Sequence, residues 1–212
     1  MTTGKVFTEQ DAALLEEFIL HRRDVRGNRF LDKVVEDEVI ERLLFAALNA
    51  PSVGFSQPWE FVIVKDPLIK AQVKQTFSEE NEKAADHFKE EYTRLKLEGI
   101  IEAPVNIAVF YKPSVAPVLG QTSMEEVGLY SVVCAIQNMW LMARALNIGM
   151  GWVSILNPDT VKQILHAPEG NKLVAWLCIG YVDKFFTQPE LEILQWEKRK
   201  EKDAVVFFDS YK

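Results

Sequence analysis

The sequence is poor in the residues that build disulfide frameworks and metal sites. It contains 2 cysteines and 3 histidines among 212 residues. His21, His87 and His166 have no metal-ligand spacing with one another or with the cysteines. Cys134 and Cys178 both lie in apolar segments, which favours buried, reduced thiols over a disulfide. We therefore expect neither a disulfide nor a bound metal.

Long apolar runs and an excess of positive charge are also missing. No apolar run approaches the roughly 18 residues of a transmembrane helix, and the N-terminus lacks the apolar stretch of a signal peptide. These absences predict a cytoplasmic protein. The formal net charge of −7 argues against non-specific binding to nucleic acid or to an anionic membrane, because both need a broad basic surface.

A compact basic cluster stands out against this acidic background. Residues 21–30, HRRDVRGNRF, contain four arginines and one aspartate, Asp24. Clustered guanidinium groups are typical of an anion site, since they match phosphate oxygens in charge and geometry. A carboxylate among them should weaken phosphate binding, so Asp24 needs a separate explanation.

Hydrophobic periodicity predicts an alternation of helices and strands. Thr8 and Asp11 have the spacing of a capping box and open the first helix. The segment 124–149 is the strongest helix, apolar nearly all round between 132 and 146 and ended by Gly149, so we expect it to be central and buried. The other predictions are helices over 8–23, 36–52 and 157–167, strands over 60–66, 105–112, 150–156 and 172–183, and a candidate last strand over 204–209.

This order of elements predicts a single α+β domain over residues 1–212. We expect a mixed central β-sheet flanked by helices, with the long helix buried at its centre. The highly charged segment 78–99 has few apolar positions, so it is predicted to be an exposed helix or a mobile cover.

Motifs spread along the whole chain carry a resemblance to a known family. Four of them, in their order and placement, resemble the flavin-binding nitroreductase family: RRDVR at 22–26, APSVGFSQPWEFV at 50–62, GWVSI at 151–155 and VAWLCIGYVD at 174–183. Asp24 inside the first motif, the unbroken APSVGFSQPW and LKLEGI at 95–100 are similar to the aerobic 5,6-dimethylbenzimidazole synthases within that family. The similarity extends from about residue 8 to residue 200.

The resemblance implies a homodimer of nitroreductase-like fold with FMN at the subunit interface. It implies that reduced FMN is a substrate and O2 a co-substrate, and that the flavin ring fragments to 5,6-dimethylbenzimidazole, the lower ligand of vitamin B12. The residual sugar would leave as erythrose 4-phosphate. A separate flavin reductase would supply the reduced FMN, so that NAD(P)H acts only indirectly.

The arginine cluster is implied to hold the FMN phosphate. Arg22, Arg23 and Arg26 follow a helix, and residues three and four apart on a helix are neighbours, so the three can converge on one phosphate. The alternative is an exposed basic helix end that complements the helix dipole. Arg199 matches a C-terminal arginine that some relatives bring to the same phosphate.

Asp24 and Ser154 are the predicted catalytic residues. The resemblance implies that Asp24 transfers protons near the ribityl chain, and the flanking arginines are expected to keep it ionised. Ser154 is expected on a strand, on the same side as Trp152, where it would bond the flavin or its oxygen adduct. From the residues alone, Asp24 could merely pair with arginines and Ser154 could be an ordinary polar group of a strand.

Further flavin contacts are implied at several loops. Pro51, Ser52 and Gln57 lie between a helix and a strand, where they can meet a flavin edge or simply form a turn beside a buried Trp59. The segment 78–99 would be a lid, with Leu97 as its flavin contact, or else a mobile surface helix. The other predicted contacts are Val25 and Val153, and the apolar part of an extension at 196–212 could reach the partner subunit.

Two other functions remain open at this point. One is an NAD(P)H-dependent nitroreductase, flavin reductase or cob(II)yrinate reductase with FMN as a recycled cofactor. The other is a non-catalytic module that binds reduced FMN, which Asp24 disfavours because binding alone would improve without the carboxylate. The absence of a G-x-G-x-x-G motif does not separate these, since nitroreductases use NAD(P)H without one. Val127 and Gly128 stand where the synthases are expected to carry a more polar pair.

Overall fold

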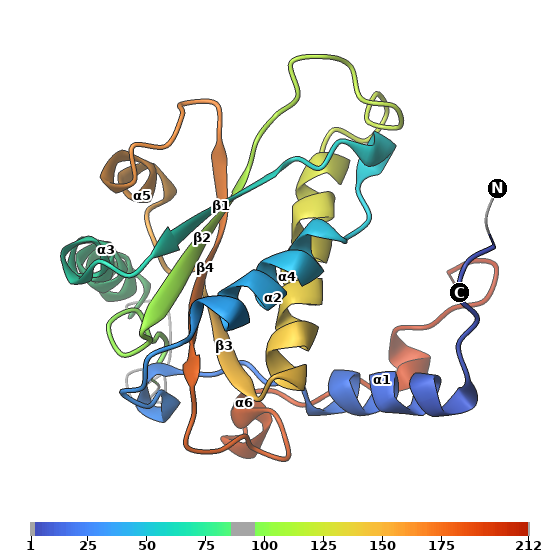
Figure 1. Ribbon diagram of the computed structural model, residues 1–212, viewed down its shortest axis with the longest axis horizontal. Coiled ribbons are helices and arrows are strands. Elements are labelled where there is room, and N and C mark those ends of the chain that lie inside the picture. The colour runs from blue at the N-terminus through green and yellow to red at the C-terminus, as the bar shows by residue number, and fades with distance from the viewer. Residues whose placement is uncertain (1–2, 86–95, 212) are drawn as a thin grey trace.

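The computed structural model describes residues 3–85 and 96–211 and shows a sheet with helices on both faces (Figure 1). The helices are α1 (Glu9–His21), α2 (Asp37–Leu48), α3 (Pro67–Ala85), α4 (Val127–Ala145), α5 (Pro158–Ile164) and α6 (Glu190–Ile193). Helices α1, α2 and α4 follow the predicted segments closely, whereas α3 begins at Pro67, well before the charged segment 78–99 in which an exposed helix or cover was expected. The α+β class is confirmed. The strands are β1 (Trp59–Val64), β2 (Val105–Tyr111), β3 (Ile148–Val153) and β4 (Lys172–Tyr181).

The four strands form one sheet in the order β1-β2-β4-β3. All three pairings between named strands are antiparallel. The parallel component comes from a bridge between Asp24 and Met150, outside the named strands. The sheet is therefore mixed only where the arginine-rich segment meets the edge strand β3.

Strand alternation divides the interior into two cores. On β2, Val105, Ile107 and Val109 pack in the core under α2 and α4, whereas Ala108 and Phe110 pack in a second core on the opposite face. That second core includes Val73 and Phe77 of α3 and Val161 of α5. Because both faces are covered, these central strands are apolar at nearly every position, as buried strands must be.

Helix α4 is buried along one side only. Val132, Ala135, Ile136 and Met139 are buried against the first core, whereas Tyr130, Val133 and Cys134 on other faces of the helix are exposed. The expectation of a fully buried helix and of a buried Cys134 is therefore wrong for the single chain. Cys178 is buried as expected, and neither cysteine forms a disulfide.

The end of α4 also differs from the prediction. The helix ends at Ala145, and Asn147 takes the left-handed conformation with φ 56°. Asparagine tolerates this conformation through its short polar side chain. Gly149 is instead a residue of β3, where an added Cβ would lie 2.3 Å from Val182. The strand therefore begins at Ile148 and ends at Val153 rather than spanning 150–156.

The two ends of the chain lie away from the sheet, on the side of α1 (Figure 1). The capping box of α1 forms as predicted, with Thr8 and Asp11 bonding each other. None of the residues of α1 is buried, and its apolar side chains, including Leu15 and Ile19, are about half exposed. The predicted strand over 204–209 does not form, because the tail lies far from any edge of the sheet.

Candidate active site

The arginine-rich segment is extended rather than helical. Helix α1 ends at His21, and Arg22 already has φ −65° and ψ 133°. Side chains of an extended chain alternate, so Arg22, Asp24 and Arg26 face one side and the intervening residues the other. The prediction that the arginines meet as neighbours on a helix is therefore wrong. The two-residue period of the extended chain instead brings Arg22 and Arg26 together with Asp24 on one side.

A close backbone contact with β3 holds this segment in place. The Val25 amide donates to the Met150 carbonyl over 3.1 Å, and the Trp152 amide donates to Asp24 Oδ1 over 3.1 Å. Gly151 makes the approach possible, because a Cβ there would lie 2.1 Å from the Val25 carbonyl oxygen. Val25 itself is buried. The Asp24 carboxylate is thus fixed by main-chain geometry.

The Arg23 side chain is buried, and most of its guanidinium N–H groups already donate hydrogen bonds within the protein. Its Nε and Nη1 donate to the carbonyls of Phe186 (3.0 Å), Leu20 (2.7 Å) and Arg22 (2.7 Å), and its Nη2 donates to that of Thr187. These bonds use four of the five guanidinium N–H groups. Arg23 therefore ties the α1 terminus to the chain after β4 and has one donor left for a ligand.

Arg22 and Arg26 line a pocket with Asp24 and Glu190, and its volume is about 130 Å³. Arg26 is held from three sides: its Nη1 donates to the Lys96 carbonyl over 3.1 Å, Nη2 lies 3.7 Å from Asp24 Oδ2, and Nε lies 3.3 Å from Glu190 Oε2. The Arg22 guanidinium lies 4.8 Å over the ring of Trp140. Arg23 also lines the pocket, which therefore combines three arginines and two carboxylates.

The pKa of Asp24 is higher than the sequence predicts. Removal of water inside this pocket raises the pKa of Asp24 above the usual aspartate range. The charge of Arg26, the Trp152 amide and the charge of Arg22 act in the opposite direction but do not outweigh it, and Glu190 adds to the rise. The arginines do favour the ionised form, as expected, but desolvation outweighs them, so the net pKa is raised rather than lowered.

Three other predicted residues lie outside the lining of this pocket. The carbonyl of Glu98, next to Leu97, accepts from the Gly27 amide over 2.8 Å, so Leu97 lies beside the arginine-rich segment. Val153 is buried at the end of β3. Ser154 follows the last strand residue and is exposed, so it does not share a strand face with Trp152 as predicted.

The charge of the C-terminal arginine also acts on the arginine cluster. Burial lowers the pKa of Arg23, and the charges of Arg22, Arg144 and Arg199 add to the effect, which places the Arg199 charge near Arg23. Of the predicted lid, residues 78–85 complete α3, and Glu98 within 96–99 contacts the arginine-rich segment through Gly27. His87 and the remainder of that segment lie outside the described residues.

The loop with Pro51, Ser52 and Gln57 lies at the other end of α4 (Figure 1). The Val53 amide donates to Ser131 Oγ near the start of that helix, whereas Trp140 Nε1 donates to the Arg23 carbonyl near its end. Nine helical residues separate these two contacts, about 14 Å along the axis. One copy of the chain therefore does not bring the loop to Asp24.

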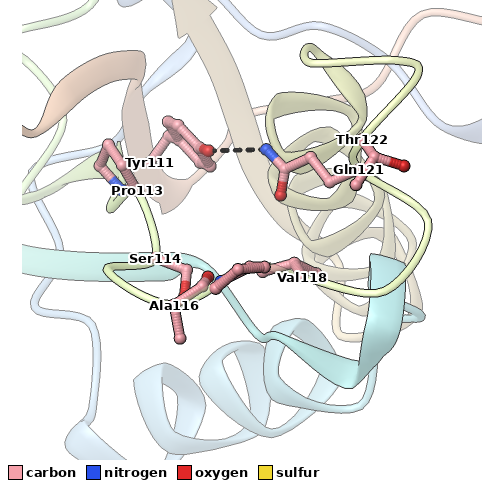
Figure 2. Close-up of a pocket in the computed structure, with 8 residues that line it drawn as sticks. Tyr111, Pro113, Ser114, Ala116, Val118, Gln121 and Thr122 are labelled. Atoms are coloured by element: carbon pink, nitrogen blue, oxygen red, sulfur yellow. Dashed lines mark hydrogen bonds between the residues drawn. The ribbon is translucent and has the colours of Figure 1, made fainter.

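A second pocket lies beside that loop, next to Tyr111 and Gln121 (Figure 2). The Gln121 amide nitrogen donates to the Tyr111 hydroxyl over 3.1 Å. Gly128 allows this arrangement, because a Cβ there would lie 2.7 Å from the Tyr111 ring. Val127 and Gly128 stand where the synthases were expected to carry a more polar pair. Close packing against Tyr111 explains the glycine at position 128.

Comparison with known proteins decides the family. The sequence profile described as "Nitroreductase family" matches residues 19–181. The chain belongs to the nitroreductase family. The resemblance read from the arginine-rich, proline-rich and strand motifs is thereby confirmed at the level of the family.

Two relatives within this nitroreductase family refine the comparison. A 5,6-dimethylbenzimidazole synthase of Rhodospirillum rubrum is 42% identical over 94% of this chain and 97% of the relative. A second, from Rhodobacter capsulatus, is 38% identical over 90% of this chain and 93% of the relative. The narrower resemblance to these synthases is therefore confirmed in sequence.

Solved structures confirm the nitroreductase fold. Oxidized iodotyrosine deiodinase bound to FMN and 3-iodo-L-tyrosine matches with a TM-score of 0.73 and 21% identity, over 93% of this chain and 100% of that one. A BluB-like flavoprotein from Clostridium difficile 630 matches with a TM-score of 0.70 and 22% identity, over 92% of this chain and 99% of that one. At these identities the likeness concerns the fold.

Some residues that line the arginine pocket were not indicated by any pattern in the sequence. Glu190 and its neighbours Pro189 and Leu191 line the pocket from a short helix far along the chain from Arg26. Only the folding of the segment after β4 against the α1 terminus brings them there. Within residues 3–85 and 96–211, no group of three potential metal ligands occurs, and no helix is long and apolar enough to span a membrane.

Proposed function

We propose that this protein is a 5,6-dimethylbenzimidazole synthase that consumes reduced FMN and O2 and releases 5,6-dimethylbenzimidazole and erythrose 4-phosphate. The observation that carries the proposal is Asp24, a carboxylate fixed between Arg22 and Arg26 in a pocket suited to phosphate. The 42% identity to a synthase over nearly the whole chain supports it. A pocket that only bound phosphate would gain affinity by omitting this carboxylate.

Arg22 and Arg26 are the proposed phosphate ligands. Both face the pocket, and a guanidinium can hold two phosphate oxygens at once. Arg23 contributes mainly by bonding the carbonyls of Phe186 and Thr187, which precede the lining residues Pro189 and Glu190 in the chain. Arg199 would add charge from the C-terminal extension, since its field reaches Arg23.

Asp24 is the proposed proton-transfer group. Reduced FMN supplies the electrons for O2 and the ring atoms of the product. With the phosphate on Arg22 and Arg26, the ribityl chain attached to it starts beside Asp24. A raised pKa lets this carboxyl group gain and lose protons closer to neutral pH than an ordinary aspartate. The Trp152 amide holds it in position, and Ser154, exposed just after β3, would orient the flavin.

The proposed site needs a second copy of the chain. The pocket of about 130 Å³ is smaller than the roughly 300–1,000 Å³ of typical ligand sites. The loop at 51–57 lies at the far end of α4 from Asp24, and α1 exposes apolar side chains along its length. A homodimer would cover α1 and let each arginine pocket meet the 51–57 loop of the partner subunit, which would complete the flavin site.

The test is an aerobic incubation of the purified protein with FMN, NADH and an independent flavin reductase, with products read by mass spectrometry. Wild type should form 5,6-dimethylbenzimidazole, and Asp24→Asn should not. Asp32→Asn is the matched control, because Asp32 is exposed and does not line the pocket. Intact FMN after NADH consumption by wild type would reject the synthase in favour of a reductase with recycled FMN.

A further inference from the structure

The proposed phosphate pocket contains a second carboxylate, Glu190, whose role the proton-transfer proposal does not explain. Its side chain is 18% exposed and belongs to the short helix α6. Glu190 Oε2 lies 3.3 Å from Arg26 Nε, closer than Asp24 Oδ2 lies to Arg26 Nη2 (3.7 Å). An anion therefore already occupies one edge of the guanidinium that should bind the phosphate.

The donors of Arg26 are limited in number. Its Nη1 donates to the Lys96 carbonyl over 3.1 Å, which fixes the guanidinium plane. The edge formed by Nε and Nη2 faces Glu190 and Asp24. The single hydrogen on Nε points along this edge, and a bidentate phosphate on it needs that hydrogen. A phosphate oxygen and Glu190 Oε2 therefore compete for the same place.

We propose that Glu190 is an internal competitor of the phosphate: it holds Arg26 in the empty pocket, yields it when FMN binds, and reclaims it when the phosphorylated product leaves. Its functional meaning rests on the proposed synthase activity. A recycled cofactor is best held permanently, but a substrate whose phosphate departs in the product must be exchanged at every turnover. A carboxylate that returns to Arg26 lowers the affinity for both phosphate monoesters and limits trapping of the product.

The charges around Glu190 indicate that it competes with the phosphate for Arg26 and does not only hold Arg26 in position. The cations that line the pocket are Arg22, Arg23 and Arg26, and the other anion is Asp24. A dianionic phosphate entering beside two carboxylates is repelled by both, and removal of one charge at this distance changes binding markedly. Arg26 would also keep its orientation without Glu190, because the Lys96 carbonyl and Asp24 still hold it.

The experiment compares Glu190→Gln with wild type by fluorescence titration of oxidised FMN, which is not consumed. FMN should bind about tenfold more tightly to the variant, as expected for about 1.4 kcal/mol. Riboflavin, which lacks the phosphate, should bind both proteins equally. Glu197→Gln makes the same change in net charge on the exposed tail outside the pocket and should leave both dissociation constants unchanged.

A second arm uses phosphate alone and product inhibition. Inorganic phosphate should displace FMN or raise the melting temperature at lower concentration in Glu190→Gln than in wild type. Erythrose 4-phosphate should inhibit benzimidazole formation by the variant more strongly. Unchanged or weaker FMN binding, or an equal change for riboflavin, would overturn the proposal.

The two proposals fail in distinguishable ways. If wild type forms no benzimidazole but Glu190→Gln binds FMN and phosphate more tightly, the synthase proposal fails and the competition stands. If wild type forms benzimidazole and the variant binds FMN no better, the competition fails alone. Equal circular dichroism spectra of variant and wild type establish that the binding data compare folded proteins.

Discussion

The main-chain amide of Trp152 donates to Oδ1 of Asp24 over 3.1 Å, which joins two residues 128 positions apart. The contact depends on Gly151, where the two backbones approach too closely for any side chain. It places one carboxylate at a defined point between two arginines.

The first prediction concerns the stability cost of Asp24. Because removal of water in the pocket raises its pKa in the folded protein, the folded chain holds this proton more tightly than the unfolded chain. The stability attributable to Asp24 is then present below the unfolded value of about 3.9 and is lost as the pH rises through the folded pKa. Asp24→Asn should therefore be more stable than wild type at pH 7 and nearly equal to it at pH 3.5, measured by urea unfolding. A less stable variant at pH 7 would contradict this.

The second prediction concerns Gly151. Gly151→Ala should push the arginine-rich segment away from β3, break the Val25–Met150 and Trp152–Asp24 hydrogen bonds, and reduce the free energy of unfolding by about 1–3 kcal/mol. FMN affinity and benzimidazole formation should fall as well. Gly170→Ala is the control, because nothing lies within 4 Å of its added Cβ, and its stability should stay within about 0.5 kcal/mol. Equal behaviour of the two variants would refute the close-contact argument.

The third prediction concerns the ion-pair network that supports the arginine-rich segment. Glu98 is buried and accepts from Lys74 Nζ (2.9 Å), Lys96 Nζ (2.7 Å) and the Ile100 amide (2.7 Å). Burial raises the pKa of Glu98, but the bonds from Lys96, Lys74 and the Ile100 amide outweigh it, and the net pKa is lowered. Its contribution to stability is therefore present above the unfolded value of about 4.3 and is lost as the pH falls through the folded pKa.

Glu98→Gln should accordingly lower the unfolding free energy at pH 7 by about 1–3 kcal/mol, since both lysines lose a partner while remaining partly solvated. The difference from wild type should shrink as the pH approaches 3, and Glu102 remains as a second partner of Lys96. Glu80→Gln, which breaks a more exposed pair with Lys83, should cost less than about 1 kcal/mol. A pH-independent difference for Glu98→Gln would show that the charge is not responsible.

The fourth prediction concerns the proposed dimer. Leu15→Asp places a charge on the exposed apolar side of α1, and it should yield a monomer that binds FMN at least tenfold more weakly. The monomer should keep its circular dichroism spectrum, because Leu15 is not part of either core. The measurement is light scattering after gel filtration, followed by FMN titration. Leu68→Asp is the control, since Leu68 is exposed on α3 and should leave the dimer intact. A monomeric wild type with full FMN affinity would reject the dimer.

Local patterns determined most of the architecture. The capping box at Thr8, the apolar run of α4 and the mostly apolar strands β2 and β4 each specify an element through near neighbours in the chain. The resemblance of short motifs such as RRDVR likewise indicated the family, because such motifs can be recognised in the sequence without knowledge of the fold. The end of α4 was predicted wrongly because asparagine can replace glycine in the left-handed position.

The site itself was decided by tertiary structure. Sequence alone suggested three arginines on one helix face around an ionised aspartate. Folding against β3 makes the segment extended, turns Arg23 inward to bond carbonyls, and removes part of the water around Asp24 so that its pKa rises. The approach of Glu190 to Arg26 joins residues 164 positions apart, for which no local pattern exists. Periodicity and capping act over a few residues and can be read along the chain, whereas desolvation, charge pairing and close backbone contact depend on what the fold brings together.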